Sequence, residues 1–107
     1  MVVPYEAGGI VDLTARLLAE HMGKVFPQPF IIENRAGAGG TIGTQYVARS
    51  KPDGHTLLVA SVAQIAIAPL VQNVSYDSVR DFIPISMFSS GVIALAVNAD
   101  AHVVWVS

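Results

Sequence analysis

Two glycine-rich stretches are the residues of this sequence whose types and spacing could do chemistry. The first is Ala7-Gly8-Gly9, and the second is Gly37-Ala38-Gly39-Gly40, which continues to Gly43. Each follows an apolar run and precedes a segment with helical periodicity, so each is expected to lead from a strand into a helix. Glycine lets a ligand approach the backbone, and free N–H groups at a helix start favour an anion. The pair indicates a carboxylate or phosphate site; the alternative is that both stretches are merely tight turns.

Neither stretch fits a known nucleotide motif. A phosphate-binding P-loop needs a Lys directly after its last glycine, whereas Gly43 is followed by Thr44 and no Lys is near. The dinucleotide fingerprint G-x-G-x-x-G, counted from Gly37, meets Ile42 at the place of its last glycine. Nucleotide binding is therefore disfavoured.

The other candidate groups are isolated. His21, His55 and His102 do not have the spacing of a metal-binding pair. Asp12 stands near the start of a helix, where capping of free N–H groups is favoured over catalysis. Ser61 follows an apolar run and is expected beside the glycine loops, where its hydroxyl could bond a ligand. The sequence therefore predicts no catalytic residue, no metal and no cofactor.

The elements that must position these residues alternate between strand and helix. Apolar, β-branched runs predict strands at 2–3, 29–33, 56–60, 83–87 and 92–97, and helical spacing predicts helices over about 11–23, 41–50 and 64–70. One further helical turn is expected at 76–82, capped by Asp77. This order predicts an α/β fold, a mostly parallel sheet with flanking helices. Both glycine loops would leave the carboxyl edge of that sheet, where open α/β sheets bind ligands.

The first helix is expected to bury one apolar stripe. Its spacing places the stripe on one face and charged residues on the opposite face. The stripe consists of Leu13, Leu17, Leu18, Met22 and Val25, and the charged residues are Arg16, Glu20 and Lys24.

Composition excludes several classes of protein. The 107 residues suffice for one domain, and a net charge of −2 gives no basic footprint for nucleic acid. Charged residues make up 13% and apolar residues 52%, which excludes an intrinsically disordered chain. Cysteine is absent, so no disulfide framework or thiolate site is expected.

Targeting signals are not evident in the sequence. The first residues, Met1-Val2-Val3-Pro4, have neither the basic nor the apolar region of a signal peptide. Residues 55–76 and 82–99 carry no charge, but Pro69 and Pro84 interrupt them. Both are therefore interpreted as core strands and short helices, not as membrane spans.

The order of these motifs closely resembles the Bug family, the TctC-like periplasmic solute receptors of tripartite tricarboxylate transporters. The resemblance rests on residues 2–9 with Asp12, then on 33–40 with Gly43, and continues through 48–49, 52–58 and 76–82. It implies a type II periplasmic binding protein, in which two α/β lobes close on a small organic acid. It also implies that the ligand-binding residues are Tyr5, Ala7, Gly8 and Gly9 of the first loop and Ala38, Gly39, Gly40 and Gly43 of the second, to which the position of Ser61 adds a hydroxyl.

The resemblance covers part of a receptor only. Residues 1–90 are expected to form part of the first lobe, and 91–107 a crossover strand with a tail unlike the family. Family members are roughly three times longer, so a second lobe is expected to be missing. A periplasmic location and membrane transporter subunits as partners are implied by the resemblance alone.

Three functions follow from these observations. The first is binding of a small organic carboxylate without catalysis, and the second is a truncated receptor without ligand that folds by self-association. The third is a small enzyme for a phosphorylated substrate, for which only Glu6 and Asp12 could act as base. A homo-oligomer is expected, formed through the apolar strand 92–97, because an unpaired apolar strand is a template for another chain.

Overall fold

A short parallel ladder lies at the centre of the computed structural model, which describes residues 1–91, 94, 96 and 98–100. Strand β1 (Val2–Val3) pairs with β2 (Glu33–Asn34), in the register Val2 to Glu33 and Val3 to Asn34. On its other side β1 makes a single parallel bridge, between Val2 and Leu58. Three segments thus run in parallel with β1 in the middle.

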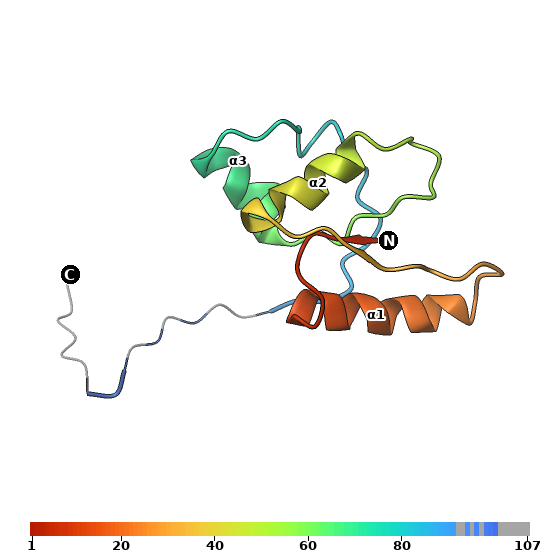
Figure 1. The fold of residues 1–107 in the computed structure, drawn as a ribbon, viewed down its shortest axis with the longest axis horizontal. Helices are drawn as coiled ribbons and strands as arrows, with labels where there is room; N and C mark the ends of the chain where they lie inside the picture. The colour runs from red at the N-terminus through yellow and green to blue at the C-terminus, as the bar shows by residue number, and fades with distance from the viewer. Residues whose placement is uncertain (92–93, 95, 97, 101–107) are drawn as a thin grey trace.

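Helices flank this ladder on both sides (Figure 1). The long helix α1 (Ile10–Gly23) lies on one side of β1. On the other side lie α2 (Thr41–Ala48), which follows the short helix η1 (Ala38–Gly40), and the continuous pair η2 (Ala63–Ile67) and α3 (Ala68–Val71). The predicted α/β class with a parallel sheet and flanking helices is confirmed.

The strands are shorter than predicted. The segment 29–33 pairs with β1 in regular ladder form only at Glu33–Asn34, and 56–60 contributes only the bridge at Leu58. Residues 83–87 form no strand, because none of the described segments lies beside them as a pairing partner. The predicted strand at 92–97 falls largely outside the described residues, and the division of the chain at residue 90 stays a prediction.

The turn at 76–82 has the capping carboxylate that the sequence indicated. Asp77 Oδ1 accepts the N–H groups of Val79 at 2.9 Å and Arg80 at 3.0 Å. The Asp81 N–H returns to the Asp77 carbonyl at 2.9 Å, which closes one helical turn. The predicted capped turn is therefore confirmed.

The core is small, and it shows that the apolar stripe predicted for the first helix was wrong at Leu13, Leu17 and Val25. Val3, Ala15 and Val59 are buried together. The face of α1 that meets the ladder carries Asp12, Ala15 and Ala19, whereas Leu13 and Leu17 are more than half exposed. Small side chains let the helix approach the strands closely, so Leu13 and Leu17 point outward, while Leu18 and Met22 are half-buried. Among the described residues, no helix is long and apolar enough to cross a membrane.

Gly43 sets the distance between α2 and the ladder. A Cβ atom at this position would lie 2.7 Å from the Arg35 carbonyl oxygen and 2.8 Å from Pro4 Cα. Both contacts are to backbone atoms of the segments that continue β2 and β1. The helix can therefore pack here only because this residue has no side chain.

We predict that Gly43→Ala lowers the free energy of unfolding by about 1–3 kcal/mol, because backbone must move to admit the methyl group. Gly23→Ala is the matched control, since Gly23 also lies in a helix and its Cβ would meet nothing within 4 Å. That variant should be neutral or more stable by up to about 1 kcal/mol. Urea unfolding followed by circular dichroism measures both, and equal effects would contradict the packing role.

Candidate anion-binding site

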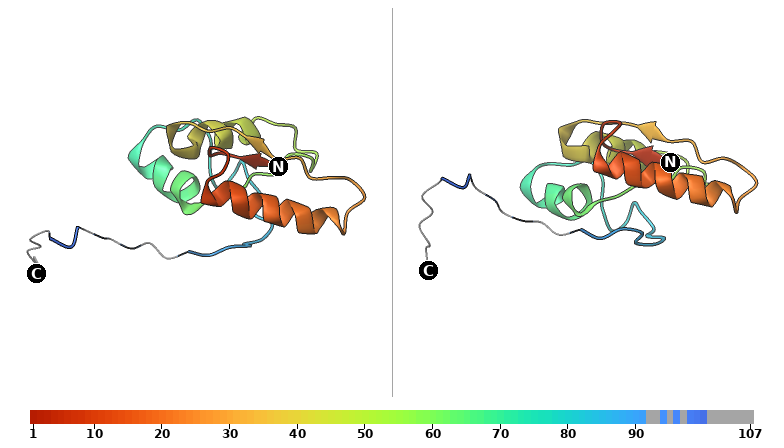
Figure 2. Two further views of the ribbon diagram at one scale, coloured as in Figure 1. Left: turned by 60° about the horizontal axis from the view of Figure 1, so that its bottom comes forward. Right: turned by 90° about the horizontal axis from the view of Figure 1, so that it is seen from below.

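Three loops meet at the carboxyl edge of the ladder. Tyr5 lies two residues beyond β1, the second glycine stretch follows β2, and Ser61 follows the segment that carries the bridge at Leu58. Because the segments are parallel, their carboxyl ends lie at the same edge, and α1 and α2 both begin there (Figures 1 and 2). The predicted position of the glycine loops at one edge agrees with this arrangement.

Tyr5 and Ser61 are joined through a residue that the sequence analysis did not single out, Gln64. Its side-chain oxygen accepts the Tyr5 hydroxyl at 2.9 Å and the Ser61 hydroxyl at 2.5 Å, while the two hydroxyls lie 3.0 Å apart. Its amide nitrogen donates to the Val59 carbonyl at 3.3 Å, and the side chain is fully buried. An amide inside an otherwise apolar segment was the signal that could have identified it, because buried polar groups need partners.

Gly40 lies against this cluster in the left-handed backbone region, at φ +91°. A Cβ atom here would be 3.0 Å from the Tyr5 hydroxyl oxygen and 3.4 Å from Gln64 Cβ. Glycine at this position therefore lets the second glycine loop contact the side chains of Tyr5 and Gln64. Gly39, at φ +66°, has nothing within 4 Å of its Cβ position and faces open space.

Asp12 joins the first loop to α1 and β2. Its Oδ2 accepts the Gly8 N–H and the Arg16 Nε–H, both at 2.9 Å, and its Oδ1 accepts the Asn34 Nδ2–H at 2.8 Å. The same Asn34 nitrogen donates to the Tyr5 carbonyl at 3.1 Å. With 1% of its surface exposed, Asp12 is a buried charge with every oxygen bonded.

The role of Asp12 differs from the predicted cap. The helix begins after Gly9, where no side chain bonds a free N–H group of the first turn. Asp12 instead reaches back to the N–H of Gly8, before the helix, and fixes the loop. Hydrogen bonds from Arg16, Gly8 and Asn34 lower the pKa of Asp12 from 3.8 to about 2. A carboxylate so engaged is a weak proton acceptor, which argues against Asp12 as a general base.

The predicted ligand-binding residues divide by exposure. Tyr5 and Ser61 are half-buried, whereas Gly40 and Gly43 are buried and act by admitting their neighbours. The exposed members are Ala7, Gly8, Gly9, Ala38 and Gly39. Within the described part of the chain, the N–H groups of Gly9 and Gly39 have no acceptor, while that of Gly8 is held by Asp12. Each glycine loop thus offers at least one free N–H group at this edge.

The site is an open edge and not a cavity. A groove of about 590 Å³ lies elsewhere, between the second half of α1 and residues 26–32, and a hollow of about 160 Å³ lies beside Thr41 and Tyr76. Neither is lined by a predicted ligand-binding residue. Over the described ranges, no three His, Asp or Glu side chains are grouped to hold a metal ion.

Comparison with solved structures defines the class of protein. A periplasmic transporter structure matches 74% of this chain with a TM-score of 0.71 and 40% sequence identity. The structure of the periplasmic binding protein BugD matches 54% with a TM-score of 0.53 and 53% identity. The chain covers 27% and 19% of those proteins. The fold is therefore part of an α/β lobe of a periplasmic binding protein.

The family follows from the sequence. The model of the tripartite tricarboxylate transporter family receptor, TctC, matches residues 14–106, and the chain belongs to this family. BugT of Bordetella pertussis (strain Tohama I) is 40% identical over 100 residues, which are 92% of this chain. A UPF0065 protein of Pseudomonas sp. (strain P51) is 38% identical over 94% of this chain. The chain spans about 30% of the length of these relatives, and the resemblance to the Bug family is confirmed.

We predict that stability falls as the pH drops from about 4 to about 2, because the folded Asp12 holds its charge with a pKa below the unfolded value of 3.8. The stabilisation is complete above the unfolded pKa and disappears as Asp12 is protonated. Asp12→Asn should be less stable at pH 6 and should lose less stability on acidification. Urea unfolding across this pH range measures both effects.

Asp77→Asn is the matched control for this prediction. Asp77 is half exposed, and hydrogen bonds from the Arg80 and Val79 N–H groups lower its pKa in the same direction. It joins no second element, so its loss should change stability less than the loss of Asp12. A larger acid effect for Asp77 would contradict the central position of Asp12.

Proposed function

We propose that this chain supplies the first-lobe surface with which a solute receptor binds a small organic carboxylate. The observation that carries the proposal is the pair of free glycine N–H groups, Gly9 and Gly39, on two loops joined through Tyr5. The family supports it, because its model is that of a transporter receptor. Backbone donors at helix starts bind anions without a cationic side chain.

The surroundings of the two N–H groups suit a carboxylate. The start of α1 lies beside the first loop, and its dipole adds about 0.3–1 kcal/mol for an anion. The Tyr5 and Ser61 hydroxyls lie at the same edge and can turn from Gln64 toward a ligand or a bridging water. The negative charge of Asp12 is balanced by Arg16 at 2.9 Å, which removes a repulsion.

Affinity is expected to be weak. This edge covers a ligand from one side, so much of the ligand would stay in water. We estimate a Kd of about 1 mM, which corresponds to about 4 kcal/mol. The carboxylate class is part of the proposal, as are a periplasmic location and the membrane subunits of a tripartite transporter as partners.

The alternative function is a receptor fragment that binds no ligand and folds by self-association, through the strand predicted at 92–97. Exposure of large apolar side chains on α1 and at 83–88 favours it. Carboxylate binding and association are measured separately, so the two functions can be told apart. A chain that associates but gives no heat with any carboxylate would support this alternative.

We predict that Gly39→Leu abolishes the binding of citrate and succinate in calorimetric titration. A side chain at this open, left-handed position both strains the loop and covers the N–H group. Gly54→Leu is the matched control, because Gly54 also has a positive φ (+81°) and open space, in a turn remote from the loops. That variant should bind as the parent chain does. Micromolar binding that survives Gly39→Leu would contradict the proposed site.

We also predict no turnover of ester, phosphate or decarboxylation substrates. In the proposed function Asp12 has a structural role, because its oxygens are engaged by three hydrogen-bond donors. Glu6 is then the only carboxylate of the first loop that could act as a base. A broad substrate screen should be blank, and Asp12→Asn should not change it. Reproducible activity that disappears with Asp12→Asn would contradict both the structural role and the receptor proposal.

A further inference from the structure

The outer edge of β2 is unpaired. Toward β1, the Glu33 and Arg35 N–H groups donate to Met1 and Val3 carbonyls at 2.9 Å. Alternate residues of a strand turn their backbone groups to opposite sides, so those of Ile32 and Asn34 face away from β1. Among the described residues, no segment pairs with that side. An open edge of this kind can accept an additional strand.

A groove of about 590 Å³ runs beside this edge, and Arg16, Glu20 and Gln28 make part of its lining polar. Its floor includes Ala19 and Gly23 of α1, whose small size leaves the space, and its wall includes Phe26, Phe30 and Ile32. The two phenylalanine rings are packed edge to face, with centroids 5.5 Å apart. The groove is thus bounded by an open strand edge and by fixed aromatic side chains.

The chain also carries a segment that matches the groove. Residues 83–88 form no helix and pair with no strand, and Ile83, Ile85 and Met87 are 80–90% exposed. Alternation of apolar residues is typical of a strand with one buried face. The segment contains no ionisable side chain, so its burial carries no charge desolvation.

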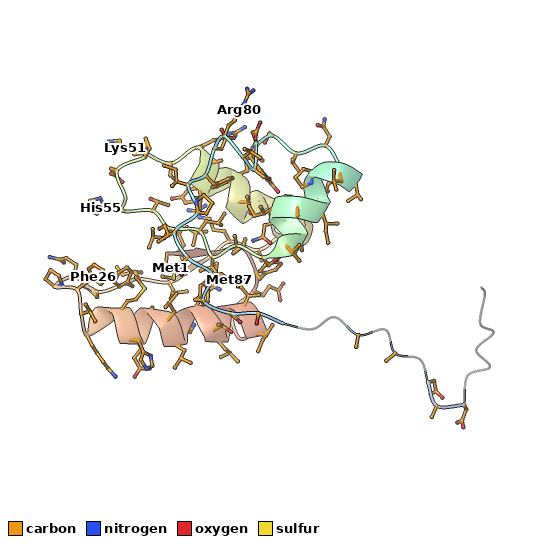
Figure 3. The ribbon with its side chains drawn as sticks, turned by 180° about the vertical axis from the view of Figure 1, so that it is seen from behind. Met1, Phe26, Lys51, His55, Arg80 and Met87 are labelled. Atoms are coloured by element: carbon orange, nitrogen blue, oxygen red, sulfur yellow. The ribbon has the colours of Figure 1, made fainter. Side chains whose placement is uncertain are left out.

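The groove and this segment lie at different ends of α1. Figure 3 shows Phe26 beyond the C-terminal end of α1 and Met87 beside its N-terminal half. A helix of 14 residues is about 21 Å long. The segment of one chain is therefore placed to meet the groove of another chain more readily than its own.

We propose that residues 83–88 of one copy add as a strand to the outer edge of β2 in a second copy and place their apolar side chains in its groove. Strand addition supplies backbone hydrogen bonds, and the groove supplies pockets for alternate side chains. Because each copy has one segment and one groove, reciprocal exchange gives a closed twofold dimer. All residues of this contact lie in the part of the chain that the structure describes. The contact does not involve the strand predicted at 92–97.

Sedimentation at micromolar concentration tests the proposal on the full chain. The parent chain should be a dimer and Ile85→Lys a monomer, since the lysine would be buried against the apolar wall formed by Phe26, Phe30 and Ile32. Val79→Lys is the matched control, because Val79 is 87% exposed outside the segment, and it should remain a dimer. A monomeric parent chain, or a dimeric Ile85→Lys variant, would overturn the proposal.

Gly23→Leu tests the groove, because its Cβ position is open and the larger side chain would fill the space. It should be a monomer, and mixing it with Ile85→Lys should restore a heterodimer through the one intact pair of surfaces. Phe26→Glu is a second groove variant should Gly23→Leu fail to fold, as judged by circular dichroism. If the mixture of the two variants contains monomers alone, the proposed contact between segment and groove is wrong.

Truncation after Ser90 separates this contact from the strand predicted at 92–97. The truncated chain keeps the segment and the groove, so it should still dimerise, and Ile85→Lys should still abolish its dimer. A truncated chain that is folded and monomeric would assign the association to the residues after Ser90 and overturn the proposed groove. Carboxylate titration of the same samples reports on the glycine loops independently of this outcome.

Discussion

The structure depends on one buried carboxylate, that of Asp12. It accepts hydrogen bonds from the Gly8 backbone, the Arg16 guanidinium and the Asn34 amide, and so ties the first loop, α1 and β2 together. A buried charge is tolerated only where every oxygen is bonded, and these three partners meet that condition. Loss of any one partner is therefore expected to destabilise all three elements. The bond to the Gly8 N–H also leaves the next donor, Gly9, free at the edge where the two loops meet.

The second loop is positioned by steric fit instead of charge. Gly40 meets the Tyr5 ring and Gly43 meets Pro4 and Arg35, so both positions depend on the absence of a side chain. Gln64 completes the contact by accepting both the Tyr5 and the Ser61 hydroxyls. The proposed site is thus built of backbone N–H groups and neutral hydroxyls, which is consistent with a chain in which charged residues are scarce.

Much of the fold could be predicted from residue patterns, and its limits have physical causes. Strand and helix alternation predicted the parallel ladder, and the glycine stretches predicted where the loops lie. The buried face of α1 could not be read from Leu13 and Leu17, because close packing on the ladder selects Ala15 and Ala19. Strand lengths were overestimated because pairing depends on neighbours, which residues 83–87 do not have among the described segments. Gln64 was missed because its partners come from distant parts of the chain.

The most direct measurement is a titration of the isotope-labelled chain with citrate, followed by amide chemical shifts. If the glycine loops bind the carboxylate, the amide signals of Gly9 and Gly39 should shift first and most, with Gly8 and Gly40 following. Phe26 and Phe30, which line the groove on the other part of the chain, should not respond. Shifts confined to the groove, or unchanged glycine amides at saturating citrate, would contradict the account.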